Sequence, residues 1–189
     1  MTKFVSKQNN MAEDIEVLRY PIGKVKLPED YSSELVRQNI RTISELPKKL
    51  IAEVGRLKDD QIETPYRPEG WTVLQTVHHI FDSHANAYMR FKLALTEDNP
   101  TIKPYKEALW AELADSKNAP AEWSLQLIDL LHKRWVIVLQ SMTDAEWQRT
   151  FYHPDMKKDM ALYKIAALYD WHSRHHLAHI VNLKERMGW

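Results

Sequence analysis

The segment WHSRHHLAH occupies residues 171–179 and carries four histidines. A helix turns by about 100° per residue, so His172, His176 and His179 fall on one stripe. His175 lies somewhat to the side of this stripe. The i, i+4 pair His172 and His176 places two imidazoles one above the other, the spacing with which a helix chelates one metal ion. A third ligand would have to come from another helix.

Apolar residues at helical spacing predict three long helices before this one. The first follows Asp30 as its N-cap, and Pro47 inside it should bend or interrupt it. The second begins at Thr72, which has Gln75 at capping-box spacing, and runs to about Leu95.

The third helix starts at residues 118–120. Six apolar residues are expected to form its core face, namely Leu127, Leu130, Leu131, Trp135, Val138 and Leu139. A turn at residues 153–155 precedes the last helix, which Asp159 is expected to cap and Gly188 to end. A short helix over residues 105–113 is expected in the long connection between the second and third helices.

Four long helices, one long connection and no alternating strand pattern predict an all-α protein, a four-helix bundle with the long connection between helices two and three. Residues 20–189 are expected to form a single domain, and residues 1–19 an N-terminal arm without an assigned function. Residues 57–66 resemble residues 142–152, and each segment follows a helix and precedes a histidine-bearing one. This likeness is either chance between two amphipathic helix ends or the mark of two pseudo-symmetric helix pairs.

Composition excludes several classes of protein. The 189-residue chain has 26 Lys and Arg against 26 Asp and Glu, whereas a nucleic-acid-binding protein normally has a basic excess. No apolar run approaches the roughly 18 residues of a membrane span, and the opening residues lack the apolar stretch of a signal peptide. We therefore expect a cytoplasmic protein without membrane contact. With no cysteine, the chain has no disulfide, no thiolate ligand and no cysteine nucleophile.

The second helix offers three histidines as the third ligand, namely His78, His79 and His84. His79 begins a polar stripe that continues to Arg90, so it is the best partner for the pair on the last helix. The remaining histidines outside the last helix are expected to be structural or exposed, namely His78, His84, His132 and His153. A lone HxxxH pair is common by chance. Several histidines on a largely buried helix must be satisfied, however, and a shared metal ion satisfies them most simply.

Several known metal-site patterns are absent from the sequence. Ser173 follows the first histidine of the pair, where a zincin has the glutamate that serves as its general base. The chain also lacks the HxE…PCxxC signature of zinc deaminases and the Glu-x-x-His pair of di-iron bundles. The predicted site therefore holds three histidines without an adjacent carboxylate base, and the sequence assigns no catalytic group.

Five segments carry a family likeness: PYRPEGWT at residues 65–72, VHHIFDSH at 77–84, RFKLALT at 90–96, FYHP at 151–154 and WHSRHHLAHI at 171–180. Together they resemble the DinB-like superfamily, most closely its YfiT branch of metal-dependent hydrolases, which is related to the bacillithiol S-transferases. The resemblance spans about residues 20–189. It implies a bundle of the DinB/YfiT-like type that binds one divalent metal ion through His79, His172 and His176, and a homodimer.

Three neutral imidazoles on Zn²⁺ or Ni²⁺ leave at least one coordination position open. Zinc in such a site lowers the pKa of bound water toward about 7, which supports hydrolysis of a small ester or amide. The same position would bind a low-molecular-weight thiol such as bacillithiol as thiolate, for transfer to a small electrophile, as the resemblance suggests. The alternative is a non-catalytic metal-clamped bundle or metal-dependent sensor, in which His179 or His175 closes the coordination.

Further expectations concern the surroundings of these histidines. Asp82 and His179 are candidates for catalytic support. Asp82 would orient a ligand imidazole or carry a proton, although a solvated carboxylate is its more common role. Arg90, Trp71 and Trp171 are candidates for substrate binding. Arg90 would bind an anionic group and the two tryptophans would wall the pocket, although core packing is the more common role of tryptophan.

Overall fold

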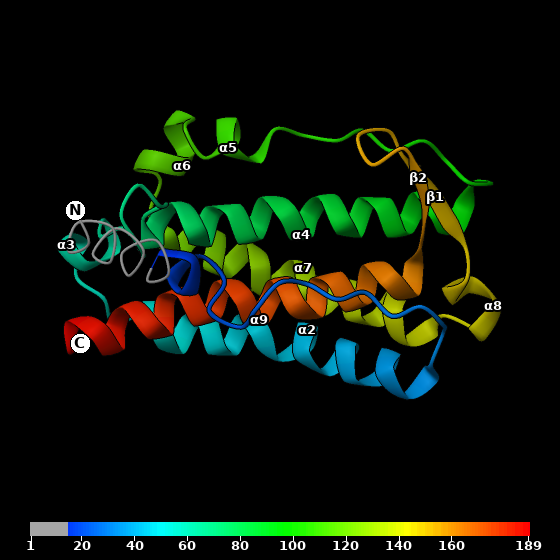
Figure 1. Cartoon of the computed structure of the whole chain (residues 1–189), viewed down its shortest axis with the longest axis horizontal. Coiled ribbons are helices and arrows are strands. Elements are labelled where there is room, and N and C mark those ends of the chain that lie inside the picture. Colours follow the sequence, from blue (N-terminus) through cyan, green and yellow to red (C-terminus); the bar gives the residue numbers. More distant parts are fainter. Residues whose placement is uncertain (1–14) are drawn as a thin grey trace, which may run out of the picture.

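The computed structural model describes residues 15–189, and four long helices dominate it (Figure 1). Their bounds are α2 (Ser33–Val54), α4 (Val73–Thr96), α7 (Ala121–Ser141) and α9 (Leu162–Met187). They pack side by side as a bundle, which confirms the predicted all-α fold class. Within the described residues, none of the helices is long and apolar enough to cross a membrane.

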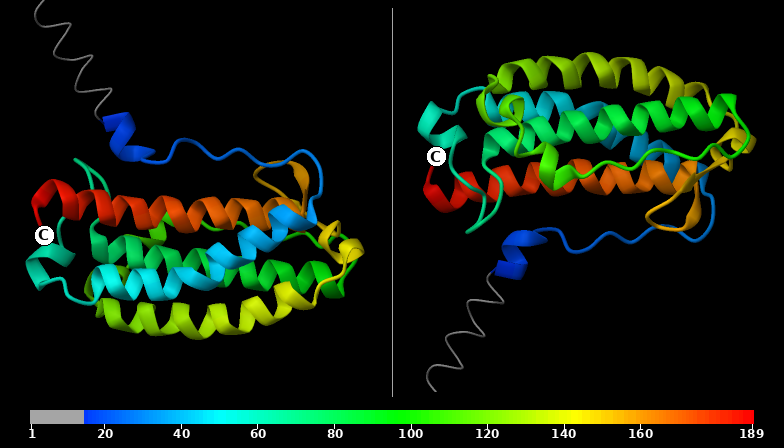
Figure 2. Two further views of the ribbon diagram at one scale, coloured as in Figure 1. Left: turned by 90° about the horizontal axis from the view of Figure 1, so that it is seen from below. Right: turned by 90° about the horizontal axis from the view of Figure 1, so that it is seen from above.

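The chain path places α2 and α4 at opposite corners of the bundle, and likewise α7 and α9. Helix α2 packs against α7 and α9, and α4 packs against the same two helices. Helices α2 and α9 run in one direction, and α4 and α7 in the other (Figures 1 and 2). Because α4 and α7 are parallel neighbours, the chain has to return along the bundle between them. This return explains the long connection at residues 97–120.

Two short helices lie in this connection, α5 (Glu107–Trp110) and α6 (Ala114–Asn118). The sequence analysis predicts a single helix over residues 105–113. A turn at residues 111–113 separates α5 from α6, so the helical part of the connection is divided in two and extends further than predicted.

Two other short helices, α3 (Asp59–Ile62) and α8 (Asp144–Trp147), share one local structure. In α3 the side chain of Gln61 accepts a hydrogen bond from the N–H at the N-cap, and in α8 Glu146 does the same. Each helix follows a long helix, and the two lie at opposite ends of the bundle (Figure 1). This arrangement is what two helix pairs related by pseudo-symmetry would have.

The start of the first helix differs from the predicted one, and the end of the last helix agrees with it. The N-cap of α2 is Ser32, whose Oγ accepts from the N–H of Leu35 at 3.3 Å, and not Asp30. Helix α2 continues through Pro47 without interruption. Gly188 ends α9 in the left-handed conformation, with φ of 69°, as the C-cap pattern predicts.

A two-stranded antiparallel sheet precedes α9 and is absent from the sequence prediction. Strand β1 (Thr150–His153) pairs with β2 (Lys158–Ala161), and the predicted turn joins them. Strands of four residues are too short to carry a recognisable alternation of apolar and polar residues. Asp159 lies within β2, so Ala161 and not Asp159 is the N-cap of α9.

The core face of α7 is rotated from the predicted one. Trp135 and Leu139 are buried as predicted, but Leu127 and Leu130 are 45% and 61% exposed. The true core face includes His132, a polar residue that the apolar pattern does not select. The predicted core face was wrong because α7 also carries leucines on its exposed outer face.

Apolar side chains form two buried clusters, one in each half of the bundle. Along α7, Ile128 belongs to one cluster and Trp135 to the other, and the buried His132 lies between them. His84, which is fully buried, holds the same position along α4. A layer of imidazoles therefore separates the two apolar clusters.

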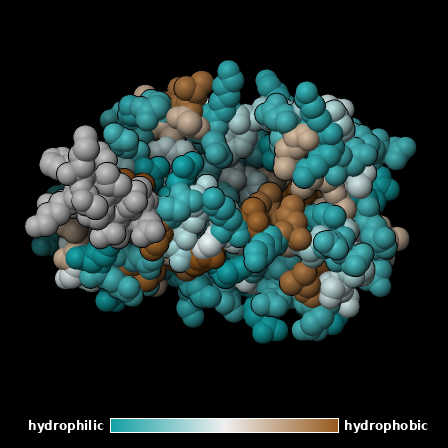
Figure 3. All heavy atoms as spheres, viewed as in Figure 1, coloured by the Kyte–Doolittle hydropathy of each residue, from teal (hydrophilic) through white to brown (hydrophobic). Residues whose placement is uncertain are grey.

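An extended segment after the helical turn at residues 15–19 runs along α9 (Figures 1 and 2). Trp171 Nε1 donates to the carbonyl oxygen of Gly23 at 3.1 Å, and the Tyr163 hydroxyl donates to that of Glu29 at 2.8 Å. This side of the molecule is largely hydrophilic, with scattered hydrophobic groups (Figure 3). Most of the predicted N-terminal arm, residues 1–14, lies outside the described residues.

Candidate metal centre

Three imidazoles from two helices converge inside the bundle. His79 lies on α4, and His172 and His176 lie on successive turns of α9. One ring nitrogen of each lies within 4.8 Å of the others, and the Nε2 atoms of His79 and His172 are 3.2 Å apart. The structure therefore brings together the three histidines that the sequence analysis selects as ligands.

The spacing of these nitrogens fits one metal ion. Two nitrogens on a tetrahedral Zn²⁺ at about 2.0–2.1 Å lie roughly 3.3 Å from one another. The 3.2 Å between the Nε2 atoms of His79 and His172 is close to this value. The Nδ1 atom of His176 is buried and has no hydrogen-bond partner. Among the described residues, no fourth ligating side chain joins this group.

Burial keeps the three imidazoles in the form that binds metal. Burial, followed by the neighbouring His175, lowers the pKa of His79 from 6.5 to about 4. The pKa values of His172 and His176 lie well below 6.5, chiefly because of burial and also because other histidines surround them. A neutral imidazole has a free lone pair on one nitrogen, so the cluster needs no deprotonation at neutral pH before it can bind a cation.

A second group of three imidazoles overlaps the first. His175, His176 and His179 also bring one nitrogen each within 4.8 Å, and all three have an unpartnered buried Nδ1. His179 donates from Nε2 to the carbonyl oxygen of Arg19 at 3.2 Å and stacks on Tyr66 with ring centroids 3.9 Å apart. Because His176 belongs to both groups, a single ion would use one group or the other.

A cavity of about 450 Å³ opens beside both groups. The structure places the two predicted wall residues here. The ring of Trp71 lies 4.6 Å from that of His79, and Trp171 stacks on His175 at 4.2 Å. Four charged side chains also line this cavity, namely Arg19, Arg67, Glu69 and Glu107.

Arg90 lines a different, smaller cavity of about 260 Å³. His153 and Tyr169 contribute to its lining. His172 and Glu107 line both cavities, so both cavities give access to the same proposed ligand, His172. The sequence analysis misses Glu107, because this residue lies on the short helix α5 in the long connection and not on a histidine-bearing helix.

The carboxylate of Asp82 does not orient any of the three proposed ligand imidazoles. Within the part of the chain that the structure describes, no hydrogen bond joins its carboxylate to an imidazole. Burial, together with the charge of Asp115, raises the pKa of Asp82 to about 6. The other predicted support, His179, belongs to the second imidazole group.

His84 and His132 form a hydrogen-bonded series with His172, a role that the sequence analysis misses. His84 Nε2 lies 3.1 Å from His172 Nδ1, and His84 Nδ1 lies 2.9 Å from His132 Nε2. His132 Nδ1 lies 2.6 Å from the carbonyl oxygen of Ile43. The available signal was a histidine at a core position between apolar residues. His78, by contrast, is structural as predicted.

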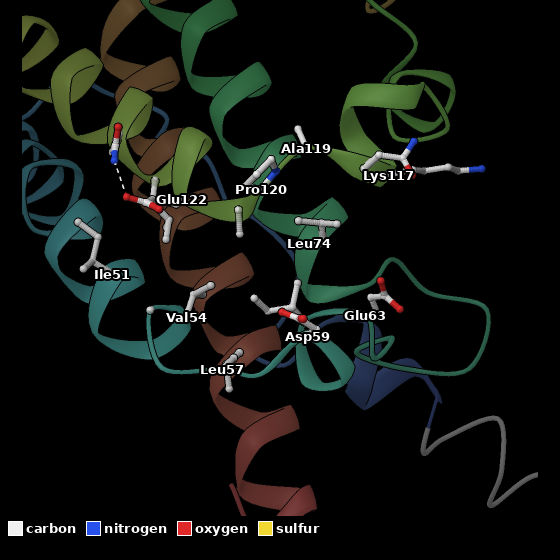
Figure 4. Close-up of a pocket in the computed structure, with 16 residues that line it drawn as sticks. Ile51, Val54, Leu57, Asp59, Glu63, Leu74, Lys117, Ala119, Pro120 and Glu122 are labelled. Carbon is white, nitrogen blue, oxygen red and sulfur yellow. Dashed lines mark hydrogen bonds between the residues drawn. The ribbon is translucent and has the colours of Figure 1, made fainter.

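A cavity of about 780 Å³ lies away from the imidazoles, between the end of α2, α3 and the start of α7 (Figure 4). Leu74 and Val54 contribute apolar lining, and Asp59, Glu63 and Lys117 contribute charges. No histidine lines it, so it offers none of the chemistry of the histidine groups.

The fold and the site together define a class of protein, a four-helix bundle with a buried histidine cluster suited to a divalent ion. The model of the DinB superfamily matches residues 42–180, and the chain belongs to this family.

Its relatives share nearly its whole length. The chain is 50% identical over 172 residues to "Putative metal-dependent hydrolase YfiT" of Bacillus subtilis (strain 168), covering 91% of this chain and 97% of that protein. A "Putative metal-dependent hydrolase" of Geobacillus thermodenitrificans (strain NG80-2) is 47% identical over 175 residues, with 93% and 98% covered. The solved structure of YfiT from Bacillus subtilis, described as "a probable metal-dependent hydrolase with an unusual four-helix bundle topology", matches with a TM-score of 0.89. That match has 50% identity and covers 92% of this chain and 99% of that one.

We expect the metal-free protein to lose stability as the pH falls from 7 to 5. Histidines of the unfolded chain titrate near 6.5, whereas those of the cluster, such as His79 at about 4, titrate lower in the folded state. Below pH 6.5 the unfolded state therefore binds more protons. Each such imidazole then lowers the free energy of unfolding by about 1.4 kcal/mol per pH unit. Urea unfolding with a chelator present measures this, and a stability that holds constant or rises toward pH 5 would contradict a neutral cluster.

Proposed function

We propose that the protein is a metal-dependent hydrolase of a small-molecule substrate, with one divalent ion on His79, His172 and His176. The observation that carries this proposal is the convergence of three neutral imidazoles at the wall of a 450 Å³ cavity, those of His79 and His176 buried and that of His172 half-buried. The names of the relatives support the same reaction class. Imidazole ligands suit both Zn²⁺ and Ni²⁺, so these are the proposed ions.

A divalent ion with three imidazole ligands lowers the pKa of a coordinated water toward about 7 or holds a coordinated thiol as thiolate. The side chains around it would bind and orient the substrate. We propose that Glu107, which lines both cavities, accepts a proton at a carboxylate oxygen. Arg90 would bind an anionic group in the smaller cavity, and Trp71 and Trp171 would pack against apolar parts of the substrate.

Thiol S-transfer is the second candidate function at the same site. The chain contains no cysteine, so a thiol nucleophile would come from a co-substrate such as bacillithiol. The open side of the cluster faces a cavity large enough for a small thiol and an electrophile. The two functions share the ion and differ in what it activates.

A closed metal clamp or a metal sensor is less well supported. A closed site needs a fourth protein ligand. His179 is held by the Arg19 carbonyl and by Tyr66, and among the described residues no fourth ligand joins His79 and its two partners. An open coordination position favours a catalytic role.

Two variants distinguish which imidazole group binds the ion. Because His176 belongs to both groups, the informative variants are His79→Ala and His175→Ala, each of which removes one ligand from only one group. We expect the wild type and His175→Ala to bind one ion per chain and His79→Ala to lose it, as measured by metal analysis after reconstitution with Zn²⁺ or Ni²⁺. Loss of the ion in His175→Ala and its retention in His79→Ala would place the ion in the second group.

A single substitution tests Glu107 as the proton acceptor. Glu107→Gln should lower the turnover of a chromogenic ester by about 10²-fold with metal content unchanged, because positioned proton transfer contributes roughly this factor. Glu69→Gln is the matched control, since Glu69 lines the larger cavity only, and its turnover should stay near that of the wild type. Wild-type turnover in Glu107→Gln would exclude this carboxylate as the base.

The same assay separates the two candidate functions. Metal-dependent ester cleavage that does not change when bacillithiol is added supports the hydrolase. Loss of an electrophile that requires bacillithiol, with no cleavage in its absence, supports the S-transferase.

We also propose that the protein is a homodimer, through the outer face of α7. This face carries four exposed apolar side chains at heptad-like spacing, Trp123, Leu127, Leu130 and Ile137, with exposures of 60%, 45%, 61% and 68%. Helix α7 lies at the outer edge of the bundle (Figure 2). A second copy of the same helix would bury this stripe, as an isologous interface requires.

Leu130→Glu should convert a dimer of twice 22.3 kDa into a monomer, because it places a charge in the centre of the stripe. Met89→Glu is the control, since Met89 is 57% exposed and lies on α4, outside the stripe. Light scattering coupled to size exclusion measures the mass. A wild-type monomer, or a dimer that survives Leu130→Glu, would refute this interface.

A further inference from the structure

We infer that Pro47 and His132 are positioning residues for the metal centre, because together they determine which ring nitrogen His172 presents to the ion. Neither residue lines the cavity beside the ligands. The inference rests on the proposed metal site for its function, but the arrangement it describes belongs equally to the metal-free protein.

The series starts in the middle of α2. In a regular helix the carbonyl of Ile43 accepts a hydrogen bond from the N–H of residue 47. Pro47 has no N–H, yet α2 continues through it. The Ile43 carbonyl therefore lacks this intrahelical donor. Its oxygen lies 2.6 Å from Nδ1 of His132 on α7, which supplies a donor in its place.

The carbonyl fixes the positions of three protons in turn. A carbonyl oxygen only accepts, so Nδ1 of His132 carries the proton and Nε2 carries the lone pair. That Nε2 accepts from Nδ1–H of His84 at 2.9 Å, and Nε2 of His84 accepts from Nδ1–H of His172 at 3.1 Å. The Nε2 of His172 is left with its lone pair, and it faces Nε2 of His79 at 3.2 Å.

The opposite order of protons is unfavourable at both ends of the series. It would set the lone pair of His132 Nδ1 against the Ile43 carbonyl oxygen at 2.6 Å, two acceptors without a proton between them. It would also place a proton on Nε2 of His172, where the ion should bind. A charged His132 would avoid the first conflict, but burial lowers the pKa of this ring to about 4.

The series connects the proposed ion to all four long helices. His79 and His84 belong to α4, His172 to α9, His132 to α7 and Ile43 to α2. A metal-binding imidazole normally donates its other N–H to a fixed acceptor, which sets its tautomer and orientation. Here two further imidazoles, those of His84 and His132, connect His172 to the fixed acceptor. That acceptor is the backbone carbonyl of Ile43, which lacks its intrahelical donor because residue 47 is proline.

The direct test is the tautomer of each ring in the metal-free wild type. Long-range ¹H–¹⁵N correlation on histidine-labelled protein at neutral pH distinguishes a protonated Nδ1 from a protonated Nε2. We expect His132, His84 and His172 all to be protonated at Nδ1. A proton on Nε2 of either His84 or His172 would overturn the inference.

Variants test whether the series matters for the ion. His132→Leu should weaken Zn²⁺ binding by about 10–100-fold, the usual effect of removing an outer partner of a metal ligand. His132→Gln should stay within a few-fold of the wild type, because its amide can donate to the Ile43 carbonyl and accept from His84. The control is His78→Leu, which removes a buried histidine bound to Ser124 and to the Ala119 carbonyl, outside the series.

Competition with a chromogenic chelator measures the dissociation constants. Equal losses of Zn²⁺ affinity in His132→Leu and His78→Leu, or no loss in His132→Leu, would show that His132 is an ordinary core residue.

Pro47→Ala restores the N–H of residue 47, which then competes for the Ile43 carbonyl. The affinity for Zn²⁺ should therefore fall, as for His132→Leu. An unchanged affinity would remove Pro47 from the series. Absence of metal from the wild type would refute the proposed function, while the tautomer measurement would still test the proton order.

Discussion

A buried imidazole has two ring nitrogens and no water to satisfy them, and this constraint organises the middle of the bundle. Leaving a buried polar atom without a partner costs roughly 1–3 kcal/mol. The protein meets the constraint in two ways. His132 and His78 are tied to backbone carbonyls that the helices hold in place. The three proposed ligands instead turn nitrogens toward a common point, where one cation would satisfy them.

The order of the helices makes this arrangement possible. Because α2 and α4 occupy opposite corners, α4 is a neighbour of both α7 and α9. Its two histidines in the layer can therefore reach in two directions. His84 contacts His132 on one side and His172 on the other, and His79 faces His172. In a bundle whose consecutive helices were neighbours throughout, α4 would pack against α2 and only one of these two partners.

The sequence predicts those parts of the site whose signal is local. The capping box of Thr72 and Gln75 forms with bonds of 3.0 and 3.1 Å, and the i, i+4 pair on the last helix lies within one element. His84 and His132 escape prediction because their partners are distant in sequence and a core histidine looks like an interruption of the apolar pattern. The role of Pro47 is hidden for the same reason. A proline in a helix predicts a break, and nothing local says that its freed carbonyl has a donor on another helix.

The protein itself supplies hydrogen-bond partners to only some of the ring nitrogens of the buried imidazoles. The Nδ1 atoms of His175, His176 and His179 are buried without partners, while the series from His172 to Ile43 is complete. A core that needed only stability would fill this layer with apolar side chains, since a half-satisfied polar network is less stable than an apolar one. The unsatisfied nitrogens all lie on residues that line the 450 Å³ cavity. A ligand that satisfies them would therefore bind from the cavity side, which is also the side from which a substrate would reach a metal ion on His79 and His176.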